Sequence, residues 1–317
     1  MGKVAPGAAS GEDGHSRAPS RRGRRLLVGV LALLVLTAVG AWMLRPAAAP
    51  TSASVLVGAS PTATPQPDPT PTPQPTPTPT GYPADTATYD LRGLPEISVF
   101  SVIPALPVDD TPYGSVTPES VRPLTSAPVW ADPRAEPVAF LPRDLEFDGT
   151  TVPVIERQAD WVKVLLVGRQ ATPSQGDPSQ VTGWMRVQDL EFTSSEAAVR
   201  VSIGQRTVDI VRGGATTRIA DDFAWGAEAT PTPLGRAFIM TTRVVPEYWY
   251  TRGHPIVYLS VQSPTLDGFG GASVAVTAFH YHDERSGPIS NGCIRLGPDS
   301  LAALAALPYG TPVTIAP

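Results

Sequence analysis

The chain has 317 residues, 37 of them proline, and a formal net charge of −5. Its first 25 residues carry six basic and two acidic side chains, a net +4, which leaves −9 for the rest. A mildly acidic remainder without basic clusters argues against nucleic acid as a partner. The length allows two small folded domains beside the proline-rich part.

The N-terminus predicts a membrane anchor. Residues 1–25 are rich in Gly, Ser, Ala and Arg, which predicts a disordered cytoplasmic tail. Residues 26–44 carry no charge, and a helix of this length spans about 28 Å, close to the hydrocarbon thickness of a bilayer. The preceding arginines predict a single-pass protein whose C-terminal domains lie outside the cytoplasm, in the cell wall. A cleaved signal peptide is the alternative, because residues 47–49 are small, but its apolar region is usually about 7–15 residues long.

Residues 45–90 predict a Pro/Thr-rich linker. Proline occupies every second position from Pro65 to Pro79. Proline fixes φ and lacks an amide donor, so residues 61–80 should form a polyproline II stalk that reaches about 60 Å. Residues 91–126 mix prolines with short apolar runs, and we assign them only as an irregular connecting region.

Residues 127–194 predict a small β-barrel. Short β-rich runs alternate with turn residues, at 128–130, 138–141, 151–155, 161–167 and 183–187. The runs Asp160–Val164 and Gly183–Val187 resemble those of a bacterial SH3-like domain. Such a domain would grip wall polymer or position an enzyme, or it would be a spacer packed on the next domain; the sequence leaves these open.

Residues 197–317 predict a second, mostly β domain. Alternating runs at 198–203 and 207–211 predict a hairpin, and further strands follow at 256–261 and 273–279. The clearest helix begins near Pro298, with Asp299 as its cap, and stops before Pro308.

Cys293 is the only cysteine, so it has no partner for an intramolecular disulfide. His280 and His282 precede it, and Arg295 follows it. Cationic neighbours lower a thiol pKa, and the start of the following helix should add to this, so Cys293 is a candidate thiolate nucleophile. The alternative is a small buried apolar residue.

The stretches Val274–His282, Gly287–Leu296 and Gly310–Ile315, with Ala229–Phe238 upstream, resemble the signature of the L,D-transpeptidase (YkuD-type) catalytic domain. The resemblance covers about residues 197–317 and implies a β-sandwich with a short helix. The family pattern has a histidine where this chain has Asn291, and the loop from histidine to cysteine is shorter here. This leaves His280 and His282 both open as the catalytic base, and we favour His280 because it directly follows the apolar strand.

The resemblance also implies roles for the site residues. Cys293 would attack a peptide carbonyl, His280 would transfer the proton, and the amides of Gly292 and Cys293 would hold the oxyanion. Arg295 would bind a substrate carboxylate or orient the loop. Ser290 and Asn291 would hydrogen-bond the imidazole or the substrate, while His282 would be solvated or line the substrate groove.

The implied substrate is the tetrapeptide stem of peptidoglycan. The family expels terminal D-alanine, joins the acyl group to a neighbouring stem, and is acylated by carbapenems. No cofactor is implied, and no Cys/His/Asp spacing suits a metal. Two alternatives stay open: an L,D-carboxypeptidase with water as acceptor, and an inactive wall-binding protein. The oligomeric state is open as well.

Overall fold

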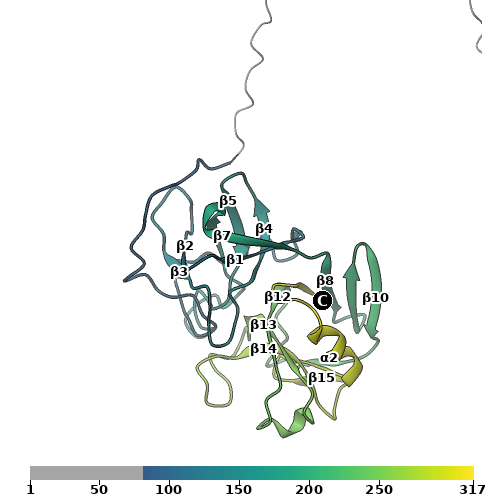
Figure 1. The fold of residues 1–317 in the computed structure, drawn as a ribbon. Helices are drawn as coiled ribbons and strands as arrows, with labels where there is room; N and C mark the ends of the chain where they lie inside the picture. Colours follow the sequence, from purple (N-terminus) through teal and green to yellow (C-terminus); the bar gives the residue numbers. More distant parts are fainter. Residues whose placement is uncertain (1–80) are drawn as a thin grey trace, which may run out of the picture. The chain divides into compact units, whose positions relative to one another are not determined.

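A computed structural model describes residues 81–317, and these form a mostly β structure with one α-helix, as predicted (Figure 1). The predicted tail, anchor and stalk at 1–25, 26–44 and 61–80 lie outside the described residues. Within residues 81–317, no helix has the length and apolar character that a bilayer span requires.

The strands fall into two groups. The N-terminal β-domain (residues 81–194) holds β1 (Glu119–Pro123), β2 (Ala127–Val129), β3 (Ala139–Leu141), β4 (Val152–Arg157), β5 (Trp161–Leu165), β6 (Thr182–Arg186) and β7 (Leu190–Ser194). The C-terminal β-domain (residues 195–317) holds β8 (Ala197–Ser202), β9 (Thr207–Arg212), β10 (Ala215–Ala220), β11 (Ala224–Gly226), β12 (Gly235–Arg243), β13 (Ile256–Gln262), β14 (Val276–Tyr281), β15 (Gly287–Ser290), β16 (Ile294–Leu296), α2 (Pro298–Ala305) and β17 (Pro312–Ala316).

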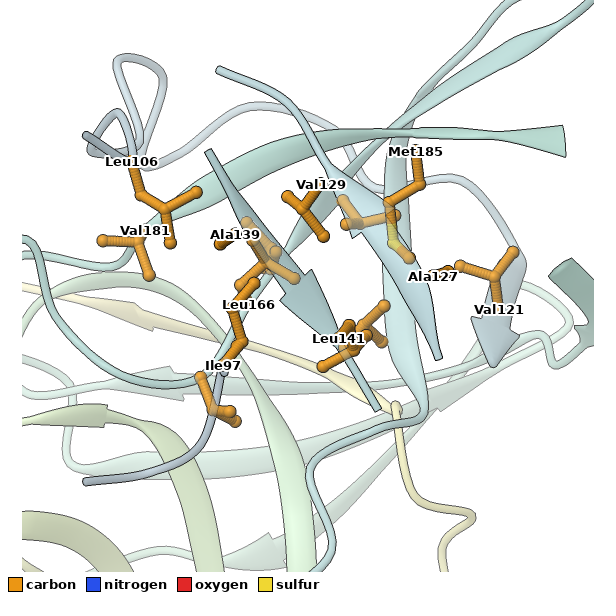
Figure 2. Close-up of a cluster of buried hydrophobic side chains, with 14 of the residues drawn as sticks. Ile97, Leu106, Val121, Ala127, Val129, Ala139, Leu141, Leu166, Val181 and Met185 are labelled. Carbon is orange, nitrogen blue, oxygen red and sulfur yellow. The ribbon is translucent and has the colours of Figure 1, made fainter. Parts of the chain in front are cut away.

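The N-terminal β-domain is built on a five-stranded antiparallel sheet in the order β6-β5-β4-β1-β7, with the β2–β3 pair beside it. Each of the five runs predicted as strands overlaps an observed strand. Their apolar side chains form one core, in which Val129, Leu141, Leu166 and Met185 are fully buried (Figure 2). The SH3-like assignment stays a prediction.

Two strands of this sheet, β1 and β7, were not assigned from the sequence. β1 lies within residues 91–126, predicted only as an irregular connection, and it pairs with both β4 and β7. Upstream of it, Ile97 and Leu106 are buried in the same core (Figure 2). This region is therefore part of the folded domain. Its prolines interrupt the alternation of apolar residues by which a strand is recognised in a sequence.

The last ten residues of the predicted 45–90 linker also pack on this domain. Tyr82 and Tyr89 pack against a cluster of three tryptophans, Trp130, Trp161 and Trp184. The indole Nε1 of Trp161 donates to the carbonyl of Pro83 at 2.8 Å. Residues 81–90 are thus a docked segment, and the linker prediction is wrong for them, because aromatic residues anchor a stretch whose composition resembles a linker.

The C-terminal β-domain contains a ten-stranded sheet in the order β10-β9-β8-β17-β12-β13-β14-β16-β11-β15. The predicted hairpin is β8–β9, and the predicted helix is α2. Gly297 occupies the N-cap position, however, and Pro298 starts the first turn. The prediction that Asp299 caps the helix is wrong, since it lies in the first turn and no side chain bonds the cap.

β12 belongs to both cores. Its side chains alternate between the two faces of the strand. Phe238 and Met240 are buried in the core of the N-terminal β-domain, whereas Ala237 and Ile239 are buried in that of the C-terminal β-domain. The two domains therefore pack on opposite faces of one strand.

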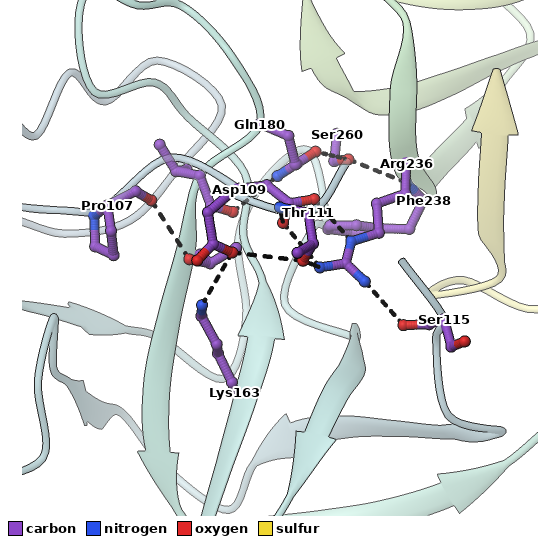
Figure 3. Close-up of polar contacts among 12 residues, drawn as sticks. Pro107, Asp109, Thr111, Ser115, Lys163, Gln180, Arg236, Phe238 and Ser260 are labelled. Carbon is purple, nitrogen blue, oxygen red and sulfur yellow. Dashed lines mark hydrogen bonds and ion pairs between the residues drawn. The ribbon is translucent and has the colours of Figure 1, made fainter. Parts of the chain in front are cut away.

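A buried ion pair extends this interface (Figure 3). Arg236 on β12 donates from Nε and Nη2 to the two carboxylate oxygens of Asp109, at 2.7 and 2.8 Å, and from Nη1 to the carbonyl of Ser115 at 2.8 Å. The Ser260 hydroxyl donates to Gln180 Oε1 at 2.6 Å across the same interface. Removing one partner of a buried pair usually costs about 3–5 kcal/mol, so this contact opposes separation of the domains.

Candidate active site

The pairing of β14 with β16 brings the predicted site together. These strands are parallel, with His280 opposite Arg295, and Cys293 immediately precedes β16. A cavity of about 470 Å³ opens over the end of this pair. Of the seven predicted site residues, all except Gly292 line it: His280, His282, Ser290, Asn291, Cys293 and Arg295.

The turn from Ser290 to Cys293 is held by its own hydrogen bonds. The buried Ser290 hydroxyl donates to the Cys293 carbonyl at 2.5 Å and accepts the Gly292 amide at 3.2 Å. Gly292 has φ of +109°, a conformation that a residue with a side chain rarely adopts. Ser290 therefore shapes the turn and does not contact the imidazole, and the Gly292 amide, predicted as an oxyanion donor, is already engaged. The Cys293 amide stays the candidate donor.

His280 is held as a neutral base. Its side chain is 8% exposed, and its Nδ1 lies 2.8 Å from the Tyr281 carbonyl. A carbonyl only accepts hydrogen bonds, so Nδ1 carries the hydrogen and Nε2 keeps its lone pair. Burial, with smaller effects from Arg295 and His282, lowers the pKa of His280 from 6.5 to about 4. The backbone carbonyl of Tyr281 thus orients the imidazole.

His282 is held in the opposite tautomer. Its Nδ1 accepts the amide of Glu284 at 3.1 Å and lies 3.4 Å from Nη1 of Arg295. Both neighbours are donors, so in the neutral ring the hydrogen sits on Nε2. The lone pair of His282 is thereby occupied within the loop, whereas that of His280 is free. This difference favours His280 as the base.

The thiolate prediction for Cys293 is wrong in direction. Burial raises the pKa of the Cys293 thiol, while the Ala278 amide and Arg295 lower it by less. Strand β16 separates Cys293 from the start of α2, and a helix dipole acts mainly within its first turn. Desolvation therefore outweighs the neighbouring cation, and the resting pair consists of a neutral thiol and a neutral imidazole.

Arg295 and Asn291 complete the polar lining. The Arg295 side chain is 14% exposed and its Nη1 lies 3.8 Å from the Glu284 carboxylate. Its Nε is buried without a hydrogen-bond partner among residues 81–317. Asn291 is exposed at the rim. Arg295 therefore retains donor capacity for an anionic group in the cavity. The same range contains no cluster of three or more His, Cys, Asp and Glu residues that suits a metal ion.

An aromatic wall, not predicted from the sequence, lines one side of the cavity. Tyr248, Tyr250, Tyr258 and Phe269 line the cavity, and the Tyr250 ring lies 5.4 Å from the His280 ring in an edge-on arrangement. Burial raises the pKa of Tyr250 to about 12, which keeps the phenol neutral. The available signal was the Tyr248–Tyr250 cluster in a chain with eight tyrosines.

The C-terminal β-domain matches a known family. The sequence model of the L,D-transpeptidase catalytic domain (YkuD) matches residues 196–315, and a search of curated proteins found no match. Among solved structures, the L,D-transpeptidase from Mycobacterium smegmatis is 15% identical over 50% of this chain and 91% of its own, with a TM-score of 0.30. L,D-transpeptidases 1 and 3 from Mycobacterium tuberculosis are 17% and 14% identical, over 49% and 61% of this chain and 93% and 99% of theirs, with TM-scores of 0.29 and 0.32. The sequence match identifies residues 196–315 as an L,D-transpeptidase (YkuD) catalytic domain.

Proposed function

We propose that the protein is a peptidoglycan L,D-transpeptidase that works by cysteine acyl transfer. The observation that carries the proposal is the neutral His280 in the Nδ1–H tautomer, in the same cavity as the only thiol of the chain. A free lone pair on Nε2 and a protonated thiol are the ground state that general-base activation of a nucleophile requires.

In the first half-reaction, Nε2 of His280 takes the proton of Cys293 as Sγ attacks the carbonyl carbon before the terminal D-alanine of a tetrapeptide stem. The tetrahedral oxyanion is held by the Cys293 amide. The carbon–nitrogen bond then breaks, and the imidazolium returns its proton to the departing amine. D-alanine leaves, and the stem remains as a thioester on Cys293.

In the second half-reaction, the side-chain amine of a neighbouring stem attacks the thioester. His280 accepts the amine proton, and the proton passes to the sulfur as the carbon–sulfur bond breaks. The product is a cross-link between two stems, with the thiol regenerated. If water takes the place of the amine, the same steps yield a free tripeptide stem.

Two features of the cavity suit a stem peptide. Arg295 places an incompletely paired guanidinium at its polar side, where it can bind a carboxylate of the donor stem. The aromatic wall of Tyr250, Tyr258 and Phe269 offers an apolar face to the backbone and methyl groups. Stem peptides carry both carboxylates and apolar methyl groups, so they match both features.

The location is part of the proposal. Residues 26–44 would anchor the chain in the cell membrane, and residues 61–80 would hold the catalytic domain in the wall. The support is the charge asymmetry and the proline repeat of the sequence.

Product analysis tests the function. The purified chain is incubated with a disaccharide tetrapeptide fragment of peptidoglycan, and the products are separated and weighed by mass spectrometry. Release of D-alanine with a cross-linked dimer supports the proposal. Release of D-alanine with only the tripeptide fragment indicates a carboxypeptidase, and binding without D-alanine release contradicts the enzymatic function.

A further inference from the structure

One wall of the active-site cavity is a hairpin that the sequence did not predict. Residues 264–275, hereafter the flap, contribute Phe269, Gly270, Ala272, Val274 and Ala275 to the cavity lining. The Phe269 and Ala272 backbones bond each other in both directions, at 3.2 and 3.0 Å. Gly270 and the following glycine both have positive φ, +60° and +87°, which suits the tight turn between them.

The base of the flap is held by a residue of the other domain. Arg169 belongs to the N-terminal β-domain and is 2% exposed. Its Nη2 donates to the carbonyl of Asp267 at 2.9 Å and to that of Ser273 at 3.1 Å, and its Nη1 donates to that of Leu266 at 3.5 Å. Because these carbonyls lie on both arms of the hairpin, the guanidinium clamps the arms together.

The position of Arg169 is itself fixed. Its amide donates to the Ser101 carbonyl at 3.0 Å, and its carbonyl accepts the Ile103 amide at 2.8 Å. The backbone therefore cannot follow the flap if the flap moves. A buried guanidinium on a rigid backbone is an anchor for the hairpin and not a passive surface contact.

A second contact joins the same two parts. The carboxylate of Asp267 in the flap accepts the amide of Ser174 at 2.9 Å and its hydroxyl at 2.6 Å. These bonds hold the pKa of Asp267 below its usual value. Deeper in the interface, Gln262 donates to the Val99 carbonyl at 2.9 Å, at the end of the strand that leads into the flap.

We propose that the N-terminal β-domain shapes the donor-stem site through Arg169, a positioning residue that sets the flap and with it the Phe269 wall of the cavity. This rests on the proposed function for the identity of the substrate. His280 and Cys293 lie on and beside β14 and β16, outside the flap, so the chemistry itself does not depend on Arg169. The N-terminal β-domain then contributes to the substrate site and is more than a spacer.

The prediction separates binding from chemistry. Hydrogen bonds to a charged group usually contribute enough to change an equilibrium by about 10–100-fold. Arg169→Met should therefore raise KM for the tetrapeptide fragment by about 10–100-fold, with kcat changed by roughly twofold at most. Amide hydrogen exchange at Phe269 and Ala272 should accelerate by a similar factor. Alkylation of Cys293 by iodoacetamide, which needs no flap, should keep its rate.

The experiment compares full-chain variants. Arg92→Met is the matched control, because Arg92 lies on the same domain and its side chain is 92% exposed; it should change none of these readouts. Arg169→Lys should recover part of the loss. If Arg169→Met does not fold, Ser174→Ala serves instead, with an expected change of about tenfold in the same direction.

The two proposals fail in different ways. A folded Arg169→Met variant with unchanged KM and unchanged flap exchange overturns the role of Arg169, even if the chain is an active transpeptidase. A wild-type chain that does not turn over the stem fragment overturns the proposed function. In that case the exchange rates of the flap still decide whether Arg169 holds it.

Discussion

The burial of His280 predicts a specific loss of stability in acid. The imidazole is neutral in the folded protein, where burial lowers its pKa from 6.5 to about 4. In the unfolded chain it regains its ordinary value, so between these pH values the unfolded state binds a proton that the folded state does not. The stabilisation from the neutral ring is complete above about pH 6.5 and is lost as the pH falls toward 4.

The magnitude follows from the same values. One pH unit corresponds to about 1.4 kcal/mol, so the interval from 6.5 to about 4 amounts to roughly 3 kcal/mol of unfolding free energy. A single domain is usually stable by only about 5–15 kcal/mol, so the effect is measurable. His280→Gln removes the titrating group and should flatten this part of the pH profile.

Urea unfolding followed by tryptophan fluorescence at several pH values between 7 and 4 measures the effect. The wild type should lose roughly 3 kcal/mol more than His280→Gln across this range. His282→Gln is the matched control, because this variant keeps the buried His280 ring. Its unfolding free energy should depend on pH as steeply as that of the wild type. Equal slopes for the wild type and His280→Gln would refute the assignment of His280 as a buried neutral base.

Further predictions test the site and the regions around it. Cys293→Ala should abolish acylation by a carbapenem, and His280→Ala should slow it by about 10²–10⁴-fold. His282→Ala should cost much less, and mass spectrometry of single-turnover reactions compares the three. Ser290→Ala removes the acceptor of the Gly292 amide and should lower the unfolding free energy by about 1–3 kcal/mol in urea titrations. Shuffling residues 61–80 should leave wall cross-linking in cells unchanged, while deleting them should reduce it without affecting turnover of soluble fragments; equal loss in both assays contradicts a stalk. Protease added to cells with a permeable wall should release a fragment lacking residues 1–45, and full protection contradicts the extracytoplasmic location.

The features that the sequence predicted well depend on local patterns. Short apolar runs identified β8, β9 and five strands of the N-terminal β-domain, β2 to β6, because the side-chain period of a strand is visible in a few residues. The motif around Cys293 identified the loop of the candidate site for the same reason. Ser290, Gly292 and Cys293 are joined by hydrogen bonds within four residues, so the sequence alone carries this arrangement.

The features that were not predicted from the sequence depend on contacts between residues that lie far apart in the chain. Residues 81–90 resemble a linker in composition, and contacts with distant residues, among them the tryptophans at 130, 161 and 184 and Arg186, dock them on the domain. Arg169 had no distinguishing neighbours in the sequence, and its partners lie about a hundred positions further along the chain. β12 lies in the part of the chain predicted as a single β domain, whereas its two faces contribute to two cores.

The charge state of Cys293 and His280, the proposed catalytic pair, shows that desolvation can outweigh the effect of residues nearby in the sequence. A cysteine two positions before Arg295 is expected to be a thiolate, because the cation favours the charged form of the thiol. Cys293 is only partly exposed in the fold, and the desolvation of a charged thiol exceeds that attraction, so the pKa of Cys293 rises while that of His280 falls. Both shifts oppose transfer of the proton before substrate binds. In the proposed reaction, the thiolate character develops only as Sγ attacks the carbonyl carbon and His280 takes the proton.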